Sequence, residues 1–253
     1  MAAQTLSQRI AQLEPHFTVV LPEGAGPFPV VVMLHGCGGR QPFLDDYAEA
    51  AREAGAASLI VDSHKPRGID RAAASLTVCT GARLQGRERA GDLYAAFAWL
   101  RTQSWADPKR LVAAGWSHGG WTILDALALR SGAEMRRATG IIDLPEEPLD
   151  GLAATFLAYP YAGLASIAGR RKPRLLPPTT AIVCGRDYIV GTKTPLAMMD
   201  RLRGHGAPVE VSVFDANTHA FDCNPAYDPR VRHDPDATRR AHSLLRELMA
   251  QAC

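Results

Sequence analysis

The chain has 253 residues, of which 28 are Lys or Arg and 26 are Asp or Glu, so its formal net charge is only +2. This balance excludes a general electrostatic attraction to nucleic acid or to an anionic membrane, and a small-molecule partner is expected instead. The length fits one large domain, residues 1–253, with a substantial single core.

No stretch is long and apolar enough for a transmembrane helix, and the first 17 residues lack the apolar centre of a secretory signal. We therefore expect a cytoplasmic protein, with export as the alternative if a signal peptide precedes this sequence. Five cysteines do not form a disulfide framework. Cys37 and Cys79 both fall in loops expected near the active face, and a bridge between them is conceivable if the protein is exported; the sequence leaves this open.

Apolar runs and helical patterns alternate along the chain, which predicts an α/β fold with a mostly parallel sheet and helices on both faces. Strands are expected at 16–22 (an edge strand), 29–34, 57–62, 110–115, 152–159, 180–185 and 209–214. Helices are expected at 43–54, 87–101, 121–129, 195–203 and 237–251. A long loop spans 63–85, and the connection 160–178 is too short for a large helical lid, so the pocket is expected to be open.

The sequence GWSHGG at 115–120 is the most informative motif, because it places Ser117 between glycines where a buried strand gives way to an apolar helix. A strand that turns abruptly into a helix with a hydroxyl at its apex has no room for Cβ atoms two residues to either side. The pattern GxSxG alone also arises by chance. The strand before it and the helix after it make this motif a predicted nucleophile elbow, with Ser117 as the nucleophile.

A second glycine-rich turn, HGCGG at 35–39, follows the predicted central strand 29–34. Glycine lets the backbone point its N–H groups inward, as a developing oxyanion requires. The predicted donors are the N–H of Cys37, with help from Gly36, and the N–H of His118. A plain turn would explain the same glycines in a chain without the elbow.

Asp187 and His219 follow two later strands, at 180–185 and 209–214. Ligands of such sheets bind beyond the carboxyl ends of the strands, and the order Ser117, Asp187, His219 is that of an α/β-hydrolase triad. His219 would take the proton of Ser117 while Asp187 fixes the imidazole tautomer. Asp215 and Asp222 are expected to fix the histidine loop. The His219, Asp222, His233 and Asp234 group matches no familiar ligand spacing, so we expect no metal.

Five residues are candidates for substrate contacts. Arg67, or alternatively Arg83, could recognise a carboxylate or another polar group from the long loop. Trp116, Tyr159 and Tyr188 are candidates for the pocket walls, although Trp116 could equally be a core aromatic residue. Gly36 completes the set from the glycine-rich turn at 35–39, which we call the predicted oxyanion loop. Trp121, Tyr161 and Ile189 are further candidates for the pocket walls, and Trp121 could equally belong to the core.

Together these motifs resemble the dienelactone hydrolase-like members of the α/β-hydrolase superfamily. The matching pieces are residues 35–39, DSHKPRG at 62–68, GWSHGG at 115–120, GRD at 185–187 and THAFD at 218–222. The resemblance covers nearly the whole chain and implies the α/β-hydrolase fold and the triad. The enzymes that gave the family its name use a cysteine nucleophile and carry a glutamate where this chain has His35. Ser117 and His35 therefore argue against dienelactone as the substrate.

The expected function is hydrolysis of carboxylic esters of small soluble substrates through an acyl-enzyme, without a cofactor. The alternatives are a noncatalytic ligand-binding protein of the same fold, or an acyltransferase or peptidase that uses the same triad. The sequence does not predict the natural substrate, the acyl chain length or the oligomeric state.

Overall fold

The computed structural model describes residues 3–130, 132–224 and 228–252, and a seven-stranded sheet lies at its centre. The spatial order of the strands is β1-β3-β2-β4-β5-β6-β7. Their bounds are β1 Phe17–Val20, β2 Phe28–Leu34, β3 Ala57–Val61, β4 Ala106–Trp116, β5 Leu152–Ala158, β6 Thr179–Cys184 and β7 Val209–Phe214. Edge strand β1 runs antiparallel to β3, and the other neighbours pair in parallel. The predicted mostly parallel sheet is confirmed.

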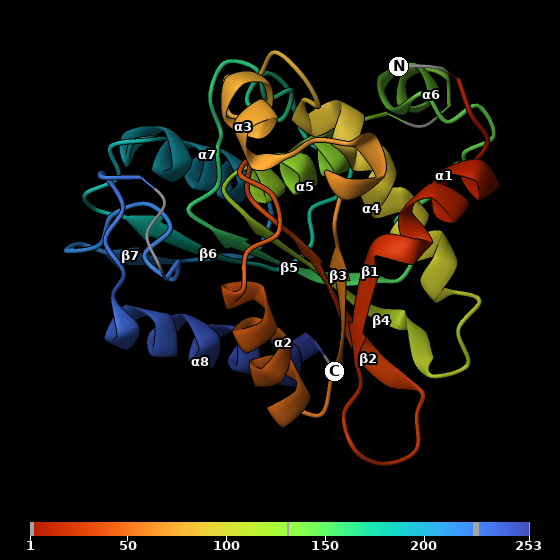
Figure 1. The fold of residues 1–253 in the computed structure, drawn as a ribbon, viewed down its shortest axis with the longest axis horizontal. Helices are drawn as coiled ribbons and strands as arrows, with labels where there is room; N and C mark the ends of the chain where they lie inside the picture. Colours follow the sequence, from red (N-terminus) through yellow and green to blue (C-terminus); the bar gives the residue numbers. More distant parts are fainter. Residues whose placement is uncertain (1–2, 131, 225–227, 253) are drawn as a thin grey trace.

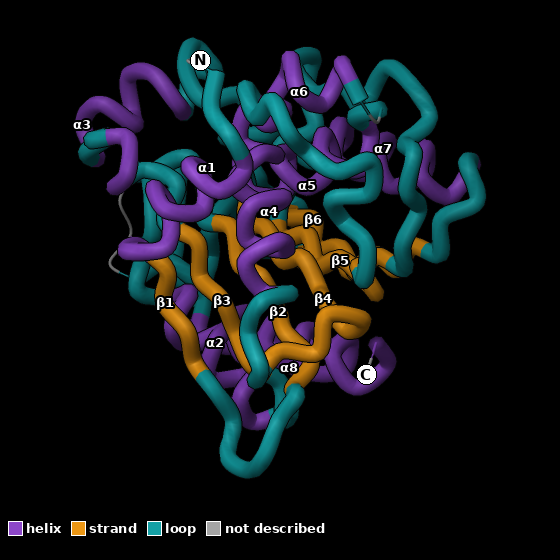
Figure 2. Tube along the Cα trace, turned by 90° about the vertical axis from the view of Figure 1, so that its right-hand side faces the viewer, coloured by secondary structure: helices purple, strands orange, loops and turns teal. Residues whose placement is uncertain are grey.

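Helices cover both faces of this sheet (Figures 1 and 2). Helices α2 (Phe43–Glu53) and α8 (Pro235–Ala252) lie on one face. The opposite face is covered by α1 (Leu6–Leu13), α4 (Gly86–Leu100), α5 (His118–Ala128), α6 (Ala133–Thr139) and α7 (Lys193–Gly204). Each face therefore has its own apolar core.

Strand β2 shows why the sheet divides the core in two. Val30, Val32 and Leu34 belong to one buried cluster, whereas Val31 and Met33 belong to the other. Successive side chains of a strand point to opposite faces, so a strand covered on both sides is apolar at every position. This continuous run is why the strand was predictable, and it holds the glycine-rich turn after Leu34 at the centre of the sheet edge.

Several elements differ from the sequence prediction. Helix α1 was not predicted, although Thr5 and Gln8 form a capping box at its start. Helix α6 was also missed, and the long loop contains three short helical turns: η2 (Lys65–Arg67), α3 (Arg71–Ala73) and η3 (Ala74–Val78). Strand β4 begins at Ala106, four residues before the predicted start. The prediction missed residues 107–110 because they are mostly polar and partly exposed, unlike the apolar run that follows them.

The connection between β5 and β6, at 160–178, contains no regular helix. In the described part of the chain, no helix is both long enough and apolar enough to span a bilayer. Loops and the short turns η2, α3 and η3 lie over the carboxyl end of the sheet.

Candidate active site

Ser117 occupies the sharp turn between β4 and α5, at φ 52° and ψ −109°. A positive φ is unfavourable for a residue with a side chain, so the surrounding structure must hold it in place. The Ser117 N–H donates to the carbonyl of Ala158 at 2.9 Å, and the Ser117 carbonyl accepts from the N–H of Tyr161 at 3.1 Å. Strand β5 and the loop after it therefore stabilise the turn.

The glycines of the predicted elbow are required by close backbone contacts. A Cβ atom at Gly119 would lie 1.9 Å from the carbonyl oxygen of Leu34, and one at Gly115 would lie 2.4 Å from the carbonyl carbon of Gly119. The first turn of α5 thus packs directly on the end of β2. This contact brings the oxyanion loop next to Ser117, and an ideal Cβ at Gly36 would lie 3.6 Å from the Cβ of Ser117.

The structure brings the three predicted triad residues into one hydrogen-bonded chain. His219 Nε2 lies 2.9 Å from Ser117 Oγ, and His219 Nδ1 lies 2.7 Å from Asp187 Oδ2. The second carboxylate oxygen of Asp187 accepts the N–H groups of Ile189 and Val190, each at 2.9 Å. All three side chains are largely buried, so the hydrogen bonds are shielded from water.

The environment of Asp187 favours its ionised form. Burial opposes ionisation, but the hydrogen bond and charge of His219, together with the two backbone N–H groups, outweigh it and lower the pKa of Asp187 below its ordinary value. An ionised Asp187 accepts the Nδ1–H of His219, which leaves Nε2 as the acceptor facing Ser117 Oγ. This arrangement suits a general base.

A fully buried arginine, Arg89 of α4, lies behind the predicted oxyanion donors. Its Nη1 donates to the carbonyl of His35 at 2.7 Å and to Nδ1 of His118 at 3.2 Å, while its Nε donates to Ser63 Oγ at 2.8 Å. Burial lowers the pKa of Arg89 to about 10, which still leaves the guanidinium charged at neutral pH. The same side chain therefore contacts both segments that carry the predicted donors, Cys37 and His118.

The two histidines beside Arg89 are neutral. Burial and the charge of Arg89 hold the pKa of both His35 and His118 well below the ordinary value. His35 Nε2 accepts the N–H of Ser63 at 3.1 Å, so its Nδ1 carries the proton and donates to the carbonyl of Gly36 at 2.7 Å. The His35 ring therefore orders the oxyanion loop and is 0% exposed.

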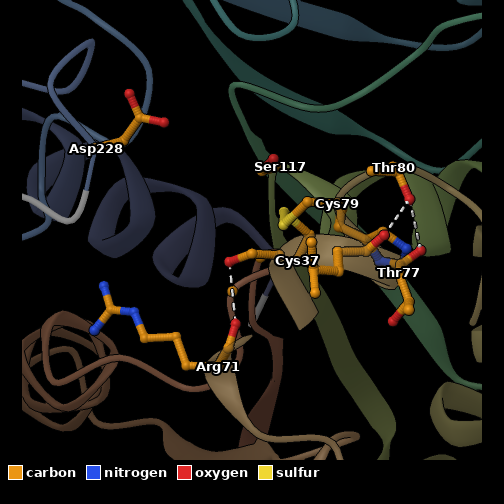
Figure 3. Close-up of a disulfide and its surroundings, with 12 residues drawn as sticks. Cys37, Arg71, Thr77, Cys79, Thr80, Ser117 and Asp228 are labelled. Carbon is orange, nitrogen blue, oxygen red and sulfur yellow. Dashed lines mark hydrogen bonds between the residues drawn. A yellow bond between two sulfur atoms is a disulfide. The ribbon is translucent and has the colours of Figure 1, made fainter. Parts of the chain in front are cut away.

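A disulfide joins Cys37 to Cys79, with Cα atoms 5.0 Å apart. It ties the oxyanion loop to the end of η3, and Figure 3 shows the bridge near Ser117 together with Thr77 and Thr80 of the same segment. The sequence had left this pairing open. Cys184 and Cys223 are buried and lie outside this bridge.

Two cavities meet at Ser117. The narrow cavity has a volume of about 30 Å³, and its lining includes Phe43, Trp116, Tyr159 and His219. The wide cavity has a volume of about 350 Å³. Its lining residues are Cys37, Val78, Cys79, Thr80, Gly81, Ser117, His118, Trp121, Tyr161, Ala165, Ile189, Val190 and Arg230.

Three of the five predicted substrate-contact residues line the narrow cavity: Gly36, Trp116 and Tyr159. The prediction that Arg67 contacts the substrate needs correction, because Arg67 lines neither cavity at Ser117. Its guanidinium instead makes a bidentate pair with the buried carboxylate of Asp92, at 2.7 and 2.9 Å. Tyr188 also lies outside both cavities, and it is 69% exposed.

Sequence reasoning missed several residues at this site. Arg89 lies within the predicted helix 87–101, and only its three-dimensional contacts distinguish it. Trp121 and Tyr161, two further predicted wall residues, both line the wide cavity. Val78 and Ala165 carry no recognisable local signal, because long loops bring them to the site.

A parallel sheet with a serine at a strand-to-helix turn, and with acid and base after later strands, defines the α/β-hydrolase class of fold. Solved structures agree. The apo structure of Thermogutta terrifontis esterase 2 matches this chain with 18% sequence identity and a TM-score of 0.66. The match covers 93% of this chain and 88% of the esterase chain. Carboxylesterase Cest-2923 from Lactobacillus plantarum is 16% identical with a TM-score of 0.66, covering 93% and 91%.

The family model described as the dienelactone hydrolase family matches residues 17–253, so the chain belongs to that family. The predicted resemblance is confirmed. A comparison with curated proteins gives no match to this chain. Family membership and the esterase-like fold support a hydrolase.

Proposed function

We propose that the protein is a serine esterase that cleaves carboxylic esters of small soluble substrates through an acyl-enzyme. The observation that carries the proposal is the continuous hydrogen-bonded chain from Asp187 through His219 to Ser117 Oγ, at 2.7 and 2.9 Å. It ends at a hydroxyl that lines two cavities.

Acylation begins when Ser117 Oγ attacks the ester carbonyl carbon and its proton passes to His219 Nε2. The carbonyl oxygen becomes an oxyanion, which accepts hydrogen bonds from the N–H groups of Cys37 and His118. His219 then gives its proton to the departing alkoxide oxygen, and the C–O bond breaks to release an alcohol. Asp187 stabilises the imidazolium between these two transfers.

Deacylation repeats the sequence with water as the nucleophile. His219 takes a proton from water, the hydroxide adds to the acyl carbon, and the oxyanion again lies at the same two N–H groups. Collapse of this intermediate breaks the bond to Ser117 Oγ, which recovers its proton from His219. The products are a carboxylic acid and free enzyme, so the reaction needs no redox partner.

The experiment measures acid release from methyl acetate and methyl butyrate in a pH-stat, for the native protein and for Ser117→Ala. We expect the variant to lose at least about 10³-fold in kcat, because the nucleophile and its base act as a unit. A fluorophosphonate probe should add one adduct to Ser117, located by peptide mass spectrometry. Thermogutta terrifontis esterase 2, a structural neighbour, has been solved phosphorylated by paraoxon.

Ser104→Ala is the matched control, because Ser104 is an exposed serine just before the opposite end of β4. It should keep native kcat and native labelling. A folded native protein that neither hydrolyses any methyl ester nor takes up the probe would contradict the esterase and favour a ligand-binding protein.

A further inference from the structure

The two cavities at Ser117 differ about tenfold in volume, at about 30 Å³ and about 350 Å³. The narrow one has room for about two water molecules, or for a methyl group. The wide one is at the lower end of the range for small-molecule sites, which suits a single aromatic ring on a short linker. An ester has two halves, so the assignment of each half to a cavity defines the substrate class.

The position of His219 decides the assignment. The alcohol oxygen must come within hydrogen-bond reach of His219 Nε2, because that atom protonates it as it leaves. His219 lines the narrow cavity and does not line the wide one. Ser117 and Cys37 line both cavities, whereas His118, the second proposed oxyanion donor, lines only the wide one. The acyl substituent therefore extends towards the side of His118, away from His219.

We propose that the wide cavity binds the acyl group and the narrow cavity binds the leaving alcohol. The preferred substrates are then esters of a bulky acid, with about one aromatic ring, and a small primary alcohol. This inference rests on the proposed esterase function.

The apolar surface of the wide cavity is preorganised. Trp121 Nε1 donates to Asp125 Oδ2 at 2.8 Å, and the Trp121 ring packs against the rings of His118 and Tyr161, with centroid distances of 5.0 and 4.8 Å. Glycine at position 86 leaves space for that ring, because a Cβ there would lie 2.5 Å from Trp121 Cδ1. A fixed aromatic surface of this kind favours stacking with a ring in the acyl group.

A second wall of the wide cavity comes from residues 78–81, next to the Cys37–Cys79 bridge. This segment is bonded covalently to the oxyanion loop, so the wall and the oxyanion donor keep a fixed separation. Ile189 and Val190, which follow Asp187 in the chain, add aliphatic side chains to the lining. The cavity thus offers apolar surface to the acyl group, while Thr80 and Arg230 add polar groups to its lining.

The narrow cavity cannot easily enlarge. Trp116 is 0% exposed and packs edge-on against Tyr47 and Phe43, with ring centroids 4.7 and 6.1 Å away. Tyr159, on the other side, donates its hydroxyl to Asp222 at 2.6 Å. Close-packed aromatic rings resist displacement, so a ring on the alcohol side would clash.

The test compares two isomeric esters, methyl phenylacetate and benzyl acetate, by pH-stat. They contain the same atoms, and their alcohols are of nearly equal acidity, so only the placement of the ring differs. We expect kcat/KM for methyl phenylacetate to exceed that for benzyl acetate by at least about tenfold, the discrimination that a poorly filled or overfilled pocket gives. Equal or faster turnover of benzyl acetate would overturn the assignment.

Two variants change the cavities separately. Ala165→Phe fills the wide cavity and should reduce the ratio of the two kcat/KM values by at least about tenfold. Gln41→Ala removes a partly buried side chain from the narrow cavity and should reduce the ratio by raising turnover of benzyl acetate. If Ala165→Phe instead impairs benzyl acetate more, the assignment is reversed.

Methyl acetate separates this inference from the function on which it rests. Hydrolysis of methyl acetate with neither isomer accepted would leave the esterase standing and overturn the bulky acyl group. Failure of all three esters, together with no probe adduct on Ser117, would remove the proposed esterase and this inference with it.

Discussion

Strained residues gather around the narrow cavity. Four non-glycine residues in the described ranges have a positive φ, and three of them, Ser117, Tyr159 and Ala220, line this cavity. Hydrogen bonds from neighbouring strands hold the first two, including one from the Tyr159 N–H to the carbonyl of Ile182 at 2.7 Å. Such strain persists only where the surroundings determine the conformation, and it is typical of sites that need preorganised atoms.

Asp187→Asn tests the proposed role of Asp187 by replacing one carboxylate oxygen with an amide nitrogen. An amide in place of the carboxylate would present an N–H to His219 Nδ1 or would lose the charge that stabilises the imidazolium, so we expect kcat to fall by roughly 10³- to 10⁴-fold with little change in KM. The measurement is steady-state hydrolysis of methyl butyrate. Asp215→Asn is the control, because Asp215 is exposed at the neighbouring strand end; an equal loss in both variants would contradict the role.

Helix α4 acts on the site through Arg89. Because its guanidinium holds the carbonyl of His35 and the ring of His118, Arg89→Met should misplace both proposed oxyanion donors, Cys37 and His118. We expect kcat to fall by about 10²-fold, comparable to the loss of one oxyanion donor, while KM stays within a few-fold. Arg89→Lys, which keeps the charge but has no planar fork, should recover only part of the loss.

Arg9→Met is the matched control for Arg89. Arg9 is a buried arginine of α1 that binds Asp92 at 2.6 Å, and it does not contact His35 or His118. It should lower the melting temperature without lowering kcat of the folded enzyme. If both variants reduce kcat in proportion to their loss of stability, Arg89 has only a structural role.

The Cys37–Cys79 bridge links two further elements, the loop after β2 and the turn η3. It closes a segment with a sequence separation of 42, for which the chain-entropy model gives a stabilisation of about 4 kcal/mol. Cys79→Ser should therefore lower the free energy of unfolding by a few kcal/mol, and tris(carboxyethyl)phosphine should lower that of the native protein similarly. Urea unfolding measures both. The double variant Cys37→Ser/Cys79→Ser should not respond to reductant, and a response there would point to Cys184 or Cys223.

Across the whole molecule, features set by neighbouring residues could be predicted from the sequence, and features set by contacts between distant residues could not. The strands and the elbow were predictable because their signals are local: continuous apolar runs in β2, and glycines where the backbones of Gly119 and Leu34 nearly touch. The proposed role of Arg67 was wrong because its partner, Asp92, lies 25 positions away on α4. No local pattern tells a solvated loop arginine from one that is paired in the interior.

The Arg67–Asp92 ion pair also stabilises the fold. Asp92, fully buried on α4, accepts hydrogen bonds from Arg9 of α1 and from Arg67 of η2, so one carboxylate joins three separate segments. Burial opposes its ionisation, but the two arginines outweigh burial and lower the pKa of Asp92 to about 2. Removing the carboxylate would leave the buried Arg9 and the partly buried Arg67 without their ionic partner, so Asp92→Asn should cost about 3–5 kcal/mol at neutral pH.

The low pKa also fixes the direction of the acid response. Above about pH 4 the carboxylate is ionised in both the folded and the unfolded chain, and its contribution to stability is fully present. As the pH falls from about 4 towards 2, the unfolded chain binds the proton first, so the free energy of unfolding declines by on the order of 2 kcal/mol from this residue. Urea unfolding of the native protein and of Asp92→Asn, at steps from pH 7 to pH 2.5, should show a steeper decline for the native protein below about pH 4. Parallel declines would mean that other carboxylates carry the acid sensitivity and that the arginines do not hold Asp92 ionised.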